Sequence, residues 1–350
     1  MPTLFDPITI GNLTLKNRIV MAPLTRCRAD EGRVPNAMMA EYYEQRSSAG
    51  LILSEATSVT SMGVGYPDTP GIWSDAQVEG WKITTEAVHK AGSRIFLQLW
   101  HVGRISDPVY LDGAKPVAPS AIRPAGHVSL VRPMKDYDEP RALTLAEIKE
   151  VVAAFRLGAV NAKAAGFDGV LIHGANGYLL DQFLQDSTNL RDDEYGGSLE
   201  NRARLMLEVT DACIDVWGKD SVAMHLAPRM DAHDMGDSNR STTFSYVATE
   251  LAKREIAFIS TREHAAEDSF TPQLKKVFGG TVIANEKFGK AEANTWLKEG
   301  KADAVAFGIP FIANPDLPKR LELDAPLNTP RPELFYGKGA VGYTDYPALV

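Results

Sequence analysis

The sequence predicts an α/β fold in which a single (β/α)₈ barrel, a TIM barrel, accounts for the whole chain. Short apolar or β-branched runs alternate with longer segments of helical periodicity, as in parallel strands joined by crossover helices. Eight strand-like runs fit into the 350 residues, and eight strands close this kind of barrel. A doubly wound sheet is the alternative, but no Gly-x-Gly-x-x-Gly segment joins the first strand to its helix. No linker or repeat divides the chain, so residues 1–350 are predicted to form one domain.

The strands and helices follow from the change between apolar runs and helical periodicity. The predicted strands are Arg18–Pro23, Leu51–Ala56, Arg94–Trp100, Gly169–His173, Val222–Pro228, Ala257–Thr261, Thr281–Ala284 and Ala302–Gly308. The predicted helices are Ala37–Ser47, Asp75–Ala91, Leu145–Ala165, Leu199–Trp217, Phe244–Arg254, Pro272–Phe278 and Ala291–Lys298. Thr144 and Glu147 have the spacing of a capping box at the start of the longest of these helices.

Two segments lie outside this alternation. An N-terminal extension precedes the first strand, and a long excursion rich in proline and glycine, Val102–Arg141, follows the third. Connections of that length inside a compact barrel are usually functional, so the excursion is expected to cover one face of the barrel.

Charge and cysteine content restrict the class of partner. The 37 Lys and Arg residues are outnumbered by 45 Asp and Glu residues, giving a net charge of −8, which disfavours nucleic acid as a partner. Cys27 and Cys213 are the only cysteines, too few for a disulfide framework, a structural zinc site or an iron–sulfur cluster. The N-terminus lacks a signal-peptide pattern, and no apolar run has the length of a membrane span. A cytoplasmic monomer or weak dimer that acts on small molecules is expected.

Strand alternation places polar residues inside the mouth of the barrel. Successive side chains of a strand point to opposite faces, so Val170 and Ile172 are expected to face the helices and His173 the barrel interior. The same alternation turns Gln98, Trp100 and His225 inward. These four residues lie near the C-terminal ends of three strands, the end at which barrel enzymes carry their active sites.

The segment His173-Gly-Ala-Asn176-Gly-Tyr178 carries the clearest chemistry. His173 and Asn176 could donate hydrogen bonds to one oxygen, an arrangement worth roughly 3 kcal/mol per donor where negative charge develops. A phenol such as Tyr178 stays protonated at neutral pH and could act as a proton donor. The alternative is that His173 is a hydrogen-bonded core residue and Tyr178 only packs.

Other chemistries find less support. The seven histidines show neither HxH nor HExxH spacing, so no metal site is predicted. No GxSxG nucleophile motif occurs, and no predicted strand ends in a lysine suited to Schiff-base chemistry. Lys287 and Gly308 follow the last two strands, where barrels of this type bind phosphate through loop backbone groups. A simple tight turn at Gly308 is the alternative interpretation.

Several motifs spread over the chain resemble those of the old yellow enzyme family. They are Phe5-Asp-Pro, Asn17-Arg-Ile-Val-Met-Ala-Pro-Leu-Thr-Arg26, Ser54-Glu-Ala-Thr57, Gln98-Leu-Trp-His-Val-Gly-Arg104, His173-Gly-Ala-Asn-Gly-Tyr178, Asp193-Glu-Tyr-Gly-Gly-Ser-Leu-Glu-Asn-Arg202, Asn314-Pro-Asp-Leu317 and Gly342-Tyr-Thr-Asp-Tyr-Pro347. They occur in order from Phe5 to Pro347. Within the family, the chain is most similar to the bacterial xenobiotic, N-ethylmaleimide and nitrate-ester reductases.

The resemblance implies a barrel that binds FMN tightly but non-covalently. NADPH or NADH would reduce the flavin and leave, and an activated alkene such as an enone or maleimide, or a nitrate ester or nitroaromatic compound, would then take its place. By position, Pro23, Thr25, Ala56 and Gln98 would surround the flavin ring. His173 and Asn176 would hold the substrate oxygen, and Tyr178 would supply the proton. Tyr66, Trp100 and Tyr336 would shape the substrate pocket.

Two positions depart from the family pattern. Many relatives carry an arginine on strand five that offsets the negative charge of the reduced flavin, where this chain has His225. They carry another arginine after the glycine of strand eight, where this chain has Ile309. Because a buried phosphate and an anionic flavin still need compensating charge, we hypothesise that a basic residue from another position supplies part of it. The candidates are Arg229, Arg262 and Lys287.

Two further functions fit the fold. A catalytically idle barrel that senses a flavin or a phosphorylated metabolite should lack the oxygen-binding pair or the proton donor, yet His173, Asn176 and Tyr178 are all present. A phosphosugar aldolase or isomerase should carry a lysine or carboxylate base at a strand end, and it should purify without colour.

Overall fold

Eight parallel strands form a closed barrel in the computed structural model, which describes residues 1–229 and 232–349. The barrel strands are β3 (Ile19–Met21), β4 (Leu51–Leu53), β6 (Ile95–Trp100), β9 (Gly169–His173), β10 (Val222–Leu226), β11 (Phe258–Arg262), β12 (Thr281–Asn285) and β13 (Ala304–Phe307). Each pairs in parallel with the next, and β13 pairs with β3 to close the ring. The predicted barrel and all eight strand positions are confirmed.

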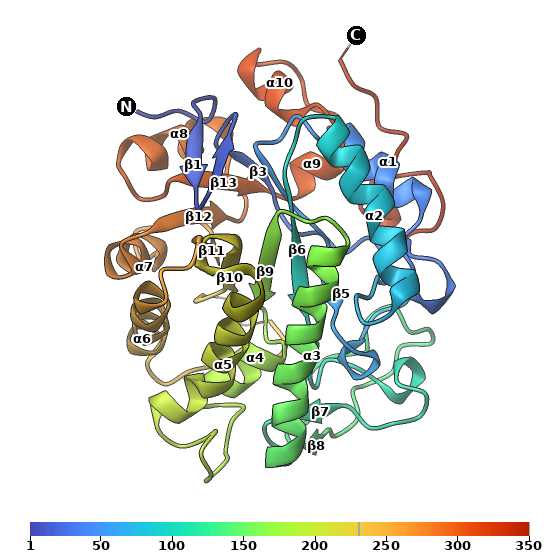
Figure 1. Ribbon diagram of the computed structural model, residues 1–350, viewed down its shortest axis with the longest axis vertical. Coiled ribbons are helices and arrows are strands. Elements are labelled where there is room, and N and C mark those ends of the chain that lie inside the picture. The colour runs from blue at the N-terminus through green and yellow to red at the C-terminus, as the bar shows by residue number, and fades with distance from the viewer. Residues whose placement is uncertain (230–231, 350) are drawn as a thin grey trace.

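Helices surround the barrel and connect its strands (Figure 1). The connecting helices are α1 (Ala37–Gln45), α2 (Asp75–Lys90), α3 (Leu145–Ala164), α5 (Leu199–Trp217), α6 (Arg240–Lys253), α7 (Thr271–Phe278) and α8 (Lys290–Lys298). After β13 the chain continues into two short helices, α9 (Ile309–Ala313) and α10 (Leu317–Glu322). All seven predicted helices are present, and the capping box of Thr144 and Glu147 begins α3 as expected. None of the helices in the described part of the chain is both long enough and apolar enough to cross a bilayer.

Smaller elements lie between or outside the repeating units. They are β1 (Ile8–Ile10), β2 (Leu13–Leu15), β5 (Thr57–Ser58), β7 (Val117–Ala118), β8 (Arg141–Ala142), α4 (Leu179–Leu184), η1 (Glu31–Arg33), η2 (Ser61–Gly63), η3 (Pro108–Tyr110), η4 (Lys219–Ser221) and η5 (Pro332–Leu334). The sequence did not predict these short pieces, because a segment of two to six residues has too few positions to show a period.

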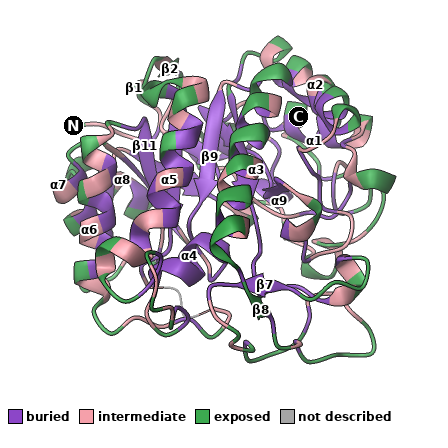
Figure 2. Cartoon of the chain, turned by 60° about the horizontal axis from the view of Figure 1, so that its bottom comes forward, coloured by how far each residue is buried: buried purple, intermediate pink, exposed green. Residues whose placement is uncertain are grey.

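Side chains of the barrel strands divide between two cores. Ile95, Leu97 and Leu99 of β6 pack in the outer core beneath the helices, whereas Phe96 packs in an inner core that fills the barrel. Leu171 of β9 joins the inner core, as the alternation of side chains predicts. Figure 2 shows the buried strands enclosed by helices whose outward faces are exposed.

The β1–β2 hairpin of the N-terminal extension packs against this inner core. Ile10 and Leu15 of the hairpin belong to the same buried cluster as Phe96 and Leu171. The hairpin thus covers the end of the barrel at which the strands begin. Access to the interior is left at the opposite end, where the strands finish.

Arginines near the first strand hold the C-terminal tail across that open end. The Arg26 guanidinium donates hydrogen bonds to the carbonyl oxygens of Phe335 (3.0 Å) and Gly342 (2.7 Å). Arg28 binds the carbonyl of Leu334 at 2.9 Å. These bonds fix a segment that lies more than 300 residues later in the chain, and they place Phe335 and Tyr336 at the rim.

Candidate active site

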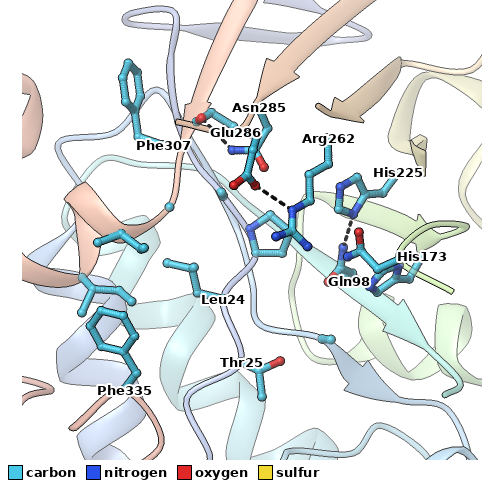
Figure 3. Close-up of a pocket in the computed structure, with 18 of the residues that line it drawn as sticks. Leu24, Thr25, Gln98, His173, His225, Arg262, Asn285, Glu286, Phe307 and Phe335 are labelled. Atoms are coloured by element: carbon cyan, nitrogen blue, oxygen red, sulfur yellow. Dashed lines mark hydrogen bonds and ion pairs between the residues drawn. The ribbon is translucent and has the colours of Figure 1, made fainter. Parts of the chain in front are cut away.

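A cavity of about 450 Å³ opens at the C-terminal ends of the barrel strands. Its walls combine apolar and polar side chains in about equal numbers, and three of the polar ones, Arg262, Glu286 and Lys287, are charged. A concave site with polar groups that converge on it is typical of a small-molecule or cofactor site. Figure 3 shows the lining residues converging from several strands and from the C-terminal tail. The sequence-predicted residues that line it are Pro23, Thr25, Ala56, Gln98, Trp100, His173, Asn176, Tyr178, His225, Lys287, Gly308, Ile309 and Tyr336.

Gln98 and His225 form a pair across one wall of the cavity. The Gln98 side-chain NH₂ donates to His225 Nδ1 at 3.1 Å, which leaves the imidazole proton on Nε2. Burial, and then the positive charge of Arg262, lowers the pKa of His225 to about 3, so the ring is neutral. His225 Nε2 has no hydrogen-bond partner among the described residues, and it is therefore an unused donor in the cavity wall.

His173 lies beside this pair as the last residue of β9. Its ring centre is 5.2 Å from that of His225, the residue opposite it in the β9–β10 ladder. Burial is the main cause that lowers the pKa of His173 well below 6.5, and the charge of Arg262 acts in the same direction. The imidazole is neutral, and Nδ1 lacks a partner within the described part of the chain.

Asn176 reaches the cavity from the turn that follows β9. Its backbone is left-handed (φ 60°), and its carbonyl oxygen accepts a hydrogen bond from His233 Nδ1 at 2.7 Å. The side-chain Oδ1 is buried and unpartnered among residues 1–229 and 232–349. An amide can present either an oxygen or two N–H donors to a ligand, so this side chain has free hydrogen-bonding capacity beside His173.

The Tyr178 phenol completes this side of the cavity. Its ring lies edge-on to Trp100 (5.0 Å between ring centres) and to His173 (5.1 Å). The Tyr178 hydroxyl is 2.8 Å from the Tyr66 hydroxyl. Burial raises the pKa of Tyr178 well above 10, so the phenol holds its proton throughout the neutral range.

Tyr66 does not itself line the cavity. It stacks on Trp100, with 5.4 Å between ring centres, and binds the Tyr178 hydroxyl from behind. Its predicted role in shaping the substrate pocket stays a prediction. Tyr336 does line the cavity, because the C-terminal tail is held across the rim.

Two of the three basic residues that could compensate the charge of the flavin lie at the cavity. Arg262 and Lys287 line the cavity, whereas Arg229 is not among the residues that do. Arg229 instead forms an ion pair with Asp268 at 3.0 Å. Arg262 ends β11 in register with Asn285, and its Nε donates to Glu286 at 2.8 Å.

Sequence reasoning missed several lining residues. They include Leu24, Asn285, Glu286, Phe288, Phe307, Pro310, Ile312 and Phe335. A signal did exist for Arg262: Phe258 of the same strand is in the inner core, so alternation turns Arg262 inward as well. No local pattern could place Phe335, whose carbonyl oxygen is held at the rim by hydrogen bonds from Arg26 and Arg28.

The cavity is surrounded by hydrogen-bonding groups that the described part of the protein leaves without a partner. The unused polar atoms of Trp100, His173, Asn176 and His225 are buried around it, and such groups are stable in a folded protein only when a ligand or water satisfies them. A family model described as "NADH:flavin oxidoreductase / NADH oxidase family" matches residues 3–328. The chain belongs to the NADH:flavin oxidoreductase family.

Relatives of known structure place this member of the family among the old yellow enzyme homologues. The old yellow enzyme homologue from Zymomonas mobilis is 47% identical, with a TM-score of 0.97 over 99% of this chain and 100% of that one. Morphinone reductase in complex with tetrahydroNAD is 46% identical, with a TM-score of 0.96 over 100% and 98% of the two chains.

Two proteins related to this chain in sequence are also named as reductases. "Probable flavin mononucleotide-dependent alkene reductase" of Leishmania infantum is 41% identical over 99% of this chain and 97% of its own length. "Putative 12-oxophytodienoate reductase 5" of Oryza sativa subsp. japonica is 44% identical over 97% of this chain and 92% of its own. The protein is therefore an FMN-dependent oxidoreductase of the old yellow enzyme type that uses a nicotinamide coenzyme. The predicted bacterial xenobiotic-reductase branch is not tested by these relatives and stays a prediction.

Proposed function

We propose that this oxidoreductase reduces the C=C bond of activated alkenes such as enones and maleimides, with NADPH or NADH as the electron donor. The observation that carries the proposal is the grouping of His173, Asn176 and Tyr178 around one cavity, with two neutral hydrogen-bonding groups next to a protonated phenol. We extend the proposal to nitrate esters and nitroaromatic compounds, whose oxygens need the same hydrogen bonds.

FMN fits the polar groups of this cavity. Pro23, Thr25 and Ala56, from the segments after β3 and β4, line it together with the Gln98–His225 pair, and these five residues would hold the ring system. When bound, FMN supplies the two-electron chemistry by taking a hydride from the nicotinamide and giving one to the alkene. Lys287, Gly308 and Ile309 follow β12 and β13, and they would lie at its phosphate, with Lys287 as the cation.

His173 and Asn176 would bind the carbonyl oxygen of the substrate. As the alkene gains a hydride, negative charge moves to that oxygen, and pre-oriented donors in a cavity of low dielectric constant stabilise it by roughly 3 kcal/mol each. A neutral imidazole is suited to this role because it donates a hydrogen bond without adding a charge to the cavity. Tyr178 would then protonate the adjacent carbon.

The high pKa of Tyr178 predicts how the reaction responds to alkaline pH. A group whose pKa is raised keeps its proton to higher pH, so we expect the rate of alkene reduction by the reduced enzyme to stay constant from about pH 7.5 to about pH 10. Single-turnover stopped-flow measurements across this range test it. A decline with an apparent pKa below about 10, the value of a free phenol, would contradict the proton-donor role.

Tyr66 should assist Tyr178 through the bond between their hydroxyls. Replacing Tyr66 with Phe removes that bond, and a single buried hydrogen bond contributes about 1 kcal/mol, so we expect alkene reduction to slow roughly tenfold or less. Flavin reduction by NADPH should be unchanged. Measuring the two half-reactions separately decides the matter, because equal slowing of both would indicate general disturbance of the cavity.

Anaerobic titration of the purified protein tests the proposed function. We expect a yellow protein whose flavin absorbance is bleached by NADPH or NADH and restored by 2-cyclohexenone, and also by glycerol trinitrate. Bleaching that neither oxidant reverses would exclude these substrates. A protein that is colourless after incubation with FMN would contradict the assignment of the cavity itself.

A further inference from the structure

Arg262 is a cation in the cavity wall, and only part of its guanidinium is hydrogen-bonded to the described part of the protein. Arg262 lines the cavity, its side chain is 29% exposed, and its Nε donates to Glu286 Oε2 at 2.8 Å. The two terminal nitrogens of the guanidinium have no hydrogen-bond partner within residues 1–229 and 232–349. In Figure 3 the guanidinium points into the space bounded by Gln98, His225 and Leu24. A guanidinium with both terminal NH₂ groups free can still bind an anionic or oxygen-rich ligand.

The polar wall next to Arg262 has no positive charge of its own. His173 and His225 are neutral, chiefly because they are buried, and the charge of Arg262 lowers the pKa of both further. Gln98 is uncharged and is already engaged with His225. At this wall, Arg262 is the group that carries positive charge.

A strained turn fixes Arg262 in this position. Glu286 has φ 110° and the following Lys287 has φ 59°, both in the region that favours glycine. Residues held in such conformations cluster at functional sites, where the surrounding structure keeps them in place. The turn brings the Glu286 carboxylate against the Arg262 Nε and leaves the terminal nitrogens facing the cavity.

We propose that Arg262 is the residue that stabilises the negative charge of the reduced FMN, and that Glu286 is a positioning residue that orients Arg262. The proposal rests on FMN occupying this cavity. Reduction adds two electrons and one proton to the flavin and so leaves one extra negative charge, and a cation nearby favours that charged state. In this chain a residue of the sixth barrel strand would do this, with a neutral imidazole on the fifth.

The test compares Arg262→Met with Arg229→Met. The first removes the cation from the cavity at similar side-chain length, and the second removes an arginine that pairs with Asp268 outside the cavity wall. We expect Arg262→Met to weaken binding of reduced FMN, relative to oxidised FMN, by ten- to a hundredfold. That ratio corresponds to a midpoint potential lower by about 30 to 60 mV for a two-electron couple.

Affinity for sulfite, which adds to oxidised flavin and leaves a negative charge on it, should fall at least tenfold. Arg229→Met should match the wild type in both measurements.

Glu286→Gln separates an electrostatic effect from a merely structural one. The glutamine keeps an oxygen acceptor for Arg262 Nε but removes the negative charge, so the potential and the sulfite affinity should rise, opposite in sign to Arg262→Met. In the double variant Arg262→Met with His225→Arg, the new cation should restore part of the lost potential. Glu286→Ala removes the same charge and also the acceptor for Arg262 Nε, so its potential should lie below that of Glu286→Gln if the carboxylate orients Arg262. This comparison also decides the matter if Arg262→Met does not fold.

Two outcomes would overturn the inference. In one, Arg262→Met binds FMN but matches Arg229→Met in potential and sulfite affinity. In the other, Glu286→Ala and Glu286→Gln have the same potential, which would show that Glu286 does not orient Arg262. Either result leaves alkene reduction intact as a function, whereas failure of the wild-type protein to bind FMN would remove the basis of both proposals.

Discussion

Replacing Tyr178 with Phe is expected to slow the reduction of 2-cyclohexenone by roughly 10²- to 10⁴-fold, the range that a positioned general acid contributes. The phenylalanine keeps the ring packed between Trp100 and His173 but removes the proton. Reduction of the flavin by NADPH needs no proton from this residue and should change by less than about threefold.

Stopped-flow measurement of each half-reaction tests this expectation. Tyr195→Phe is a matched control, because it removes a buried hydroxyl that binds Glu208 (2.9 Å) rather than one at the cavity. Reduction of glycerol trinitrate provides an internal control, since no carbon is protonated. If both half-reactions slow equally, Tyr178 is not the proton donor.

Removing both hydrogen-bonding groups near the substrate oxygen should have the second large effect. In the double variant with His173→Ala and Asn176→Ala, alkene reduction is expected to fall by at least 10³-fold. One donor of this type contributes about 10²- to 10³-fold, and the effects of two donors to one oxygen need not multiply. The loss should appear with enones and with nitrate esters alike, because both substrates present an oxygen.

The variants must retain FMN for this comparison, which their absorbance spectra show directly. His264→Leu is a suitable control, because its side chain is exposed and lies outside the cavity wall. A double variant that reduces 2-cyclohexenone within tenfold of the wild-type rate would show that these residues do not stabilise the developing charge.

Much of this architecture could be predicted from the sequence. Side-chain alternation along β6 and β9 predicts which residues pack in the inner core and which pack in the outer core. It does so because one face of each strand is turned toward the helices and the other toward the barrel interior. The same alternation turned Gln98 and His173 inward. Parallel strands that end at one rim then bring residues distant in sequence into one cavity.

The features that could not be predicted depend on contacts between residues that are distant in the sequence. The predicted strands end at Pro228 and Thr261, before Arg229 and Arg262, so alternation along them did not separate the two arginines. β11 in fact continues to Arg262, which alternation then turns inward. The strained turn at Glu286 is imposed by the surrounding structure against the ordinary preference of the residue. Tyr66 was placed by family resemblance, whereas its contacts with Trp100 and with the Tyr178 hydroxyl come from the folded structure.

A crystal structure of the yellow protein soaked with 2-cyclohexenone would show where the flavin and the substrate bind. We expect electron density for FMN in the cavity at the C-terminal end of the barrel, with its ring against Ala56 and Gln98 and its phosphate near Lys287 and Gly308. The enone oxygen should lie within hydrogen-bonding distance of His173 and Asn176, with the Tyr178 hydroxyl near the carbon next to the carbonyl. Flavin bound elsewhere, or an enone oxygen that contacts neither His173 nor Asn176, would contradict the account.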